Sequence, residues 1–252
     1  MEIVCLCAFA ALAGFIDSVA GGGGLIQLPA LLIFLPHEAI AHLLGTNKLA
    51  SIAGTFFAAG QYSRHVRISW KTTLPATLAA LVFSFLGARV ASHMNPALMR
   101  VVIIMLLVAI LIHSFARKDF GARHAPRAHD VRHYLFSIAT GMVLGFYDGF
   151  FGPGTGSFLI FVFIGVFGFS FLSASASSKV VNLATNLSAV LYFGFTDNIL
   201  YALALPMAAS NIAGSLVGAR LAILKGNRFV RIFFLVVVSA MVVKLGYDTF
   251  AK

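Results

Sequence analysis

The sequence predicts an all-α polytopic membrane protein made of two inverted repeats. Of its 252 residues, 60% are hydrophobic and only 10% are charged, whereas soluble domains are about 45–50% apolar and about 25% charged. Gly14-Phe15-Ile16-Asp17 returns as Gly145-Phe146-Tyr147-Asp148, an offset of 131 (145 minus 14), and the same offset relates Lys48 to Lys179 without a gap. An apolar chain with such a duplication is typical of transporters whose site lies between the repeats.

Ten apolar segments follow one another along the chain, in two sets of five that a basic loop separates. The first set lies at 3–20, 24–36, 42–62, 72–91 and 98–116. The second set lies at 134–151, 155–171, 174–195, 198–222 and 229–250. We therefore divide the chain into a first transmembrane repeat (1–116), a basic cytoplasmic linker (117–133) and a second transmembrane repeat (134–252).

The second segment of each repeat is too short, or barely long enough, to cross a bilayer upright, since a helix needs about 20 residues to do so. Glycines and one proline separate it from the first segment, at 21–24 and at 152–156. Such residues unwind a helix, and unwound backbone at membrane depth is tolerated only inside protein or beside water. We expect each repeat to contain a glycine-broken hairpin plus three transmembrane helices, which gives 8–10 membrane segments.

Basic residues in the loops predict the orientation of the repeats. Arg64, Arg67 and Lys71 follow the third segment of the first repeat, whereas the matching loop at 196–198 holds no basic residue. Because basic loops stay in the cytoplasm, matching loops are expected on opposite sides of the membrane, which makes the repeats inverted. The net charge of +10 is explained in the same way, so we expect no nucleic-acid partner.

Lys48 and Lys179 are the candidate anion-binding cations, because each lies inside an apolar segment. A lysine at the bilayer centre costs about 2.5–3.5 kcal/mol, and snorkelling to the interface is the alternative. The half-helices after the glycine breaks also favour anions at their N-termini. The candidate substrate-binding set is Lys48, Lys179, Asn47, Ser178, Gly23, Gly24, Gly154, Thr155, Asn182 and Asn186.

Asp17 and Asp148 directly precede the glycine breaks. They could neutralise the two lysines as structural ion pairs, or exchange protons as coupling groups. The sequence does not separate these roles, because burial raises the pKa of a carboxylate whereas a nearby lysine lowers it.

The two break regions also resemble known family motifs. Gly14 to Gly24, followed by Thr46-Asn47-Lys48, resembles the first motif of the TauE/SafE sulfite exporter family; Gly145 to Ser157, followed by Ser178-Lys179, resembles the second. The resemblance covers residues 5–248 and is strongest to the YfcA-like bacterial branch. It implies a multi-pass permease of the bacterial inner membrane, usually described with eight spans, that carries sulfite, sulfonates, thiosulfate or related anions.

We therefore expect a secondary transporter whose partners are a small anion, the lipid bilayer and a coupling proton or sodium ion. A passive anion channel would use the same lysines. A membrane-embedded enzyme acting on lipid phosphate would need a nucleophile cluster for which the repeats give no support. We expect no enzymatic activity, no cofactor and no metal site, and the sequence leaves a homodimer open.

Overall fold

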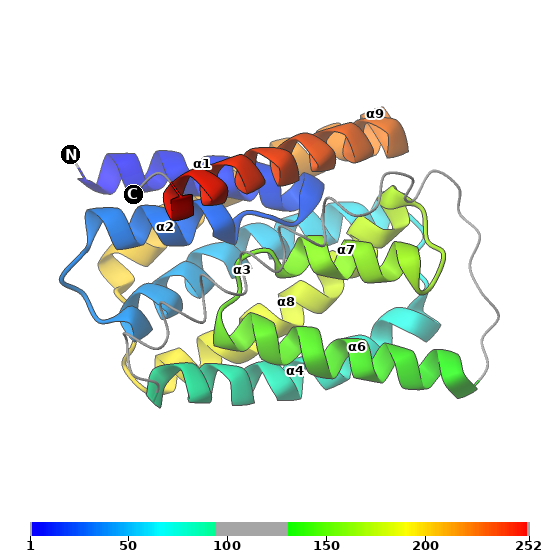
Figure 1. Ribbon diagram of the computed structural model, residues 1–252, viewed down its shortest axis with the longest axis horizontal. Coiled ribbons are helices and arrows are strands. Elements are labelled where there is room, and N and C mark those ends of the chain that lie inside the picture. Colours follow the sequence, from blue (N-terminus) through cyan, green and yellow to red (C-terminus); the bar gives the residue numbers. More distant parts are fainter. Residues whose placement is uncertain (1, 94–130, 251–252) are drawn as a thin grey trace.

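The computed structural model describes residues 2–93 and 131–250, with side chains described up to Val230 and at a few positions beyond. These residues form eight helices that lie along one bundle (Figure 1). The helices are α1 (Glu2–Ala20), α2 (Gly24–Phe34), α3 (Ile40–His65), α4 (Trp70–His93), α6 (Val131–Phe150), α7 (Thr155–Gly165), α8 (Phe171–Phe195) and α9 (Tyr201–Phe250).

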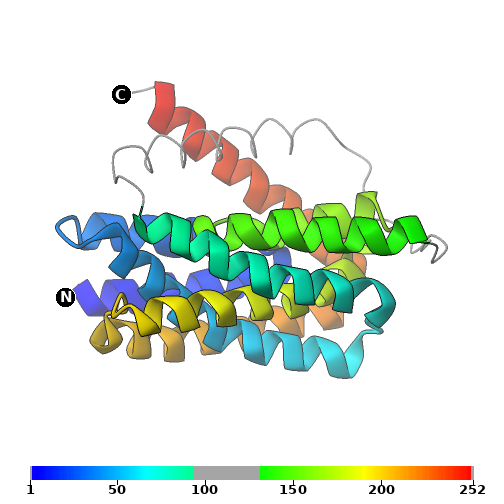
Figure 2. The same cartoon turned by 90° about the horizontal axis from the view of Figure 1, so that it is seen from below.

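The two repeats contain matching helices. Adding 131 to the bounds of α2 gives 155 and 165, the bounds of α7, and adding it to the starts of α3 and α4 gives the starts of α8 and α9. The segment expected at 98–116 lies outside the described residues, and α6 begins at Val131, inside the range expected for the linker. The segments expected at 198–222 and 229–250 are joined in α9, but Gly226 (φ 69°, ψ −163°) interrupts the helix between them, and the red end of α9 leans away from the bundle (Figure 2).

Helices that match between the repeats run in opposite directions along the bundle (Figure 1). The first helix of each repeat packs along the fourth helix of the other, α1 beside α9 and α6 beside α4. In the first of these contacts, Asn211 Nδ2 donates to Ala10 O and Ser215 Oγ donates to Gly14 O, both at 3.1 Å. The inverted orientation across a membrane stays a prediction. It requires matched helices to run in opposite directions, as they do in this bundle.

Glycines that occur in both repeats mark the closest helix contacts. A Cβ at Gly14 would overlap the backbone of Asn211, and a Cβ at the matching Gly145 would lie 2.5 Å from Ala80 Cα. Position 80 is itself the match of position 211, so both repeats use the same contact. Small residues let backbones approach closely in membrane helices, and packing therefore explains why these glycines occur twice.

Three of the described helices are long and apolar enough to cross a membrane: Glu2–Ala20, Trp70–His93 and Tyr201–Val230. Helices α3 and α8, with 26 and 25 residues, have the length to cross but carry the lysines and asparagines of the candidate site. Helices α2 and α7 have 11 residues each. Eleven residues of helix extend only about 16 Å, which agrees with the prediction that these segments are too short, or barely long enough, to cross a bilayer upright.

Replacing Gly145 by alanine should lower the free energy of unfolding by about 1–3 kcal/mol, because the added carbon forces α6 away from α4. Thermal unfolding of the purified protein in detergent measures the effect. Gly60→Ala is the matched control, since a Cβ at Gly60 in α3 would meet no described residue within 4 Å apart from its chain neighbours and the adjacent turns of its own helix backbone. The control should unfold at the wild-type temperature or slightly above it; equal loss in both variants would contradict a tight α4–α6 contact.

Candidate functional site

The two glycine breaks contact each other inside the bundle. Gly21 (φ 77°) and Gly152 (φ 93°) adopt the left-handed conformation that favours glycine, which confirms that both helices unwind here. Ser157 N donates to Gly21 O at 2.9 Å, and Ser157 Oγ donates to Ala20 O at 2.8 Å. A Cβ at Gly21 would lie 2.7 Å from Gly156 Cα. The breaks therefore join backbone from both repeats at one place.

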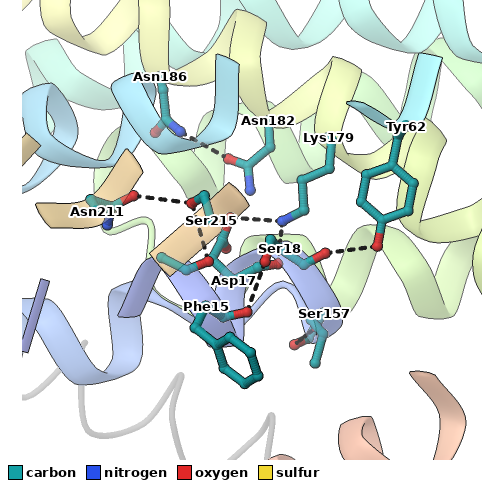
Figure 3. A network of polar contacts seen from close by, with 12 residues as sticks. Phe15, Asp17, Ser18, Tyr62, Ser157, Lys179, Asn182, Asn186, Asn211 and Ser215 are labelled. Carbon is teal, nitrogen blue, oxygen red and sulfur yellow. Dashed lines mark hydrogen bonds and ion pairs between the residues drawn. The ribbon is translucent and has the colours of Figure 1, made fainter. Parts of the chain in front are cut away.

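Each lysine is paired with the aspartate of the other repeat. Lys48 Nζ donates to Asp148 Oδ2 at 2.6 Å, and Lys179 Nζ donates to Asp17 Oδ2 at 2.7 Å. Lys179 Nζ also donates to the backbone oxygen of Asp17 (Figure 3). Two ammonium groups and two carboxylates thus form a centre without net charge at the interface of the repeats.

Burial makes this pairing necessary. The side chains of Lys48 and Lys179 are 3% and 0% exposed, so both are enclosed by protein and neither snorkels. A buried charge without a partner costs several kcal/mol. Helices α3 and α8 place each lysine beside the unwound end of the helix that carries the opposite aspartate, and the breaks give the carboxylates room to reach them.

The two pairs differ in their surroundings. Lys48 Nζ also donates to Asn186 Oδ1 at 3.2 Å, and Asp148 is only 2% exposed. Asp17, in contrast, is 19% exposed. The centre is therefore only pseudo-symmetric: the Lys48–Asp148 pair is enclosed, whereas the carboxylate of the Lys179–Asp17 pair is partly accessible.

A cavity of about 20 Å³ lies at the ion pairs. Of the predicted site residues, eight line it: Asp17, Gly24, Asn47, Lys48, Asp148, Gly154, Asn182 and Asn186. Ser51 and Thr55 of α3 complete the polar wall. This volume holds about one water molecule, which is less than a sulfite-sized anion needs.

Four predicted residues do not line the cavity: Lys179, Ser178, Gly23 and Thr155. Lys179 binds Asp17, which does line the cavity. Thr155 Oγ1 donates to Gly152 O at 2.7 Å and so holds the second break. Ser178 Oγ is buried and has no hydrogen-bond partner among the described residues.

Two amides behind the cavity were missed by the sequence interpretation. Gln27 Nε2 donates to Asn47 O at 3.3 Å, and Asn211 Nδ2 donates to Gln27 Oε1 at 2.9 Å. This chain of hydrogen bonds ties α2, α3 and α9 together. Gln27 is a lone polar residue in its apolar run, and Asn211 follows Ser210 in another. An amide side chain in such a run could have identified both, since polar residues in membrane helices usually face the protein interior.

Tyrosine hydroxyls fix the breaks from the side. Tyr62 OH donates to Ser18 O at 2.9 Å, and Tyr147 OH donates to Pro153 O at 2.7 Å. A hydrogen bond to a buried carbonyl of unwound backbone replaces the helical bond that the carbonyl has lost. The two breaks are thus held by side chains from α3 and α6.

The arrangement as a whole, apolar helices around a buried ionic centre at the repeat interface, is that of a membrane transporter. Residues 6–245 match the profile of the family described as sulfite exporter TauE/SafE. The chain is 34% identical over 238 residues to the probable membrane transporter protein ORF9 of Sinorhizobium sp, covering 94% of this chain and 89% of that protein. It is 32% identical over 242 residues to the probable membrane transporter protein YfcA of Escherichia coli (strain K12), covering 95% and 88%. The chain therefore belongs to the sulfite exporter TauE/SafE family and is a membrane transporter rather than an enzyme.

Replacing Lys48 by methionine should lower the free energy of unfolding by about 3–5 kcal/mol, because Asp148 is left buried without its cation. Adding Asp148→Asn should recover part of this loss, since the uncompensated charge is removed. Denaturant unfolding of both single variants and the double variant measures the coupling. Lys71→Ala, at an exposed position, is the control without effect. Strict additivity of the two single losses would contradict a coupled pair.

Proposed function

We propose that this protein is a secondary transporter that moves a small anion, sulfite or a related organosulfur anion, across the inner membrane of a bacterium. The crossed ion pairs carry this proposal. Two buried lysines from different repeats each bind a carboxylate, and an incoming oxyanion can take the place of that carboxylate.

The exchange is chemically matched. Sulfite and sulfonate oxygens, like carboxylate oxygens, accept short charge-assisted hydrogen bonds from an ammonium group. Asn182 and Asn186 line the same cavity and offer amide donors. Helices α2 and α7 begin at the cavity, and the positive ends of their dipoles favour the same charge.

Replacement of a carboxylate also supplies a coupling mechanism. When an anion binds Lys48, Asp148 loses its cation in a buried position, and the free carboxylate must then reach water or take up a proton. Anion binding and proton uptake are thereby linked at the same centre. Asp17 and Lys179 provide the equivalent pair on the other repeat.

The cavity must enlarge before an anion fits, because about 20 Å³ holds only about one water molecule. Inverted repeats that rock about a central site provide such a change and alternately open it to the two sides. The ion pairs and the backbone contacts between the breaks join the repeats here, so they are the contacts that the rocking motion has to break and remake.

Sulfite, thiosulfate and a sulfonate should raise the unfolding temperature of the purified protein, because a ligand that binds the folded state stabilises it, by about 2.7 kcal/mol at a hundred times its Kd. Lys48→Ala and Lys179→Ala should abolish both this shift and uptake into proteoliposomes. Lys71→Ala should behave as wild type. A shift with a carboxylate but with no sulfur anion would overturn the substrate class, and normal uptake by both lysine variants would overturn the site.

Asp148→Asn should strengthen anion binding, because the substrate no longer competes with a carboxylate for Lys48. The same variant should carry the anion without its proton signal, which a pH dye inside the vesicles records. Asp197→Asn, in the exposed loop after α8, is the control that keeps the signal. Electrical current without any pH signal in the wild type would favour a passive channel and contradict the proposed coupling.

A further inference from the structure

Four of the five buried side-chain oxygens that have no hydrogen-bond partner among the described residues lie toward one end of the bundle, and the fifth, Asn47 Oδ1, belongs to a residue that lines the cavity. Gln61 Oε1, Ser137 Oγ, Ser175 Oγ and Ser178 Oγ have no hydrogen-bond partner among the described residues. They lie in the last two turns of α3 and in the first two turns or so of α6 and α8. These helix ends lie at the same end of the bundle (Figure 1). Arg64 in the last turn of α3 and Arg67 in the loop that follows mark this end, and we call this segment the Arg64–Arg67 loop.

Hydrogen bonds place the serines beside α4. Thr73 Oγ1 donates to Ser177 Oγ at 3.0 Å, and a 2.7 Å hydrogen bond joins Thr72 Oγ1 to His133 Nε2. Gly141 of α6 packs on Ala76 of α4, so one turn earlier Ser137 lies level with Thr72. We call this set the hydroxyl path: Thr72, Thr73, Ser137, Ser175, Ser177 and Ser178. It extends from the residue next to Lys179 toward the start of α6.

Helix packing alone does not account for these serines. Some serines elsewhere in the bundle hydrogen-bond a carbonyl of a neighbouring helix, as Ser84 Oγ does with Thr185 O at 2.8 Å and Ser188 Oγ does with Leu81 O at 2.6 Å. Such bonds are the usual role of a hydroxyl between membrane helices. Ser137, Ser175 and Ser178 make no such bond within the described part of the chain, although they are as deeply buried.

The repeats differ at this point. The positions that match Ser137, Ser175 and Thr73 at the other end of the bundle hold Leu6, Leu44 and Ala204, all buried. The positions that match Ser177 and Ser178 hold Thr46 and Asn47, which are polar and buried. The polar lining therefore exists beside the ion pairs in both repeats, but only one end of the bundle continues it through Ser137, Ser175 and Thr73. A structural need common to both repeats would not produce this difference.

We propose that the hydroxyl path is a water-lined route through which water and protons reach Asp17 and Lys179 from the side of the Arg64–Arg67 loop. Hydroxyls both donate and accept hydrogen bonds, and a buried water needs two to four such partners. Uncharged hydroxyls suit water and protons better than an anion, which they cannot neutralise. Asp17 is the partly exposed carboxylate of the centre. It binds Lys179 of α8, and Tyr62 OH of α3 donates to the backbone oxygen of the next residue, Ser18 (Figure 3).

The route rests on the proposed function, because it supplies the proton that the ion-pair exchange requires. The route also specifies the side of the membrane from which protons arrive. On this proposal the route connects the Lys179–Asp17 pair, whose carboxylate is partly exposed, with one side of the membrane, whereas the side chains of the Lys48–Asp148 pair are enclosed.

Cysteine labelling tests the route. In a Cys5→Ala, Cys7→Ala background, Ser137→Cys and Ser175→Cys introduce thiols at nearly constant volume. Leu6→Cys and Leu44→Cys are the repeat-matched controls. A membrane-impermeant, cationic thiosulfonate should modify the two serine-derived thiols at least about tenfold faster than the controls, and only from the side of the Arg64–Arg67 loop, since reaction requires an accessible, ionisable thiol. Equal rates for serine-derived and control thiols, or faster reaction from the other side, would overturn the route.

This labelling requires no substrate, so it stands or fails independently of sulfite binding. A second measurement addresses protons. Ser137→Ala with Ser175→Ala should slow anion-driven proton uptake into vesicles severalfold, while the shift of the unfolding temperature by sulfite stays as in wild type. Unchanged proton uptake would overturn the role in proton delivery, whereas loss of the sulfite shift would place these serines in the anion site instead.

Discussion

Four charges inside an apolar bundle, three of them enclosed and the Asp17 carboxylate partly accessible, are the constraint on which the rest of the structure depends. Among the described residues, the aspartate of the other repeat is the carboxylate that neutralises each lysine, so neither repeat satisfies its own charge there. An unpaired buried charge costs more than most packing defects. The interlocked course of the helices, α1 along α9 and α6 along α4, is the arrangement that brings the opposite charges together.

Glycine has two separate uses in this arrangement. At Gly21 and Gly152 it provides a backbone conformation that other residues avoid, which turns the chain back beside the ion pairs. At Gly14 and Gly145 it provides space, because a side chain there would collide with the neighbouring helix. The first use shapes the site and the second sets the helix spacing that holds the site in place.

Much of the fold could be predicted from the sequence, since short segments and helix breaks follow from local residue types such as glycine and proline. The charged residues of the candidate site could be predicted, because a charge inside an apolar segment is costly and is usually found only where it is paired or functional. The sequence could not predict which aspartate pairs with which lysine, because the pairing depends on packing between helices that are distant in the chain. Gln27 and Asn211 were missed because Phe158 and Ala80, at the matching positions, give no repeat signal.

The crossed pairing also has a consequence for biosynthesis. Lys48 leaves the ribosome 100 residues before Asp148, and Asp17 leaves it 162 residues before Lys179. At about 5–20 residues per second, the first repeat waits several seconds or longer with its charges unmatched. During that time it can insert but cannot complete its interior, so the nascent first half must be held near the lipid headgroups or by the insertion machinery until the second half arrives.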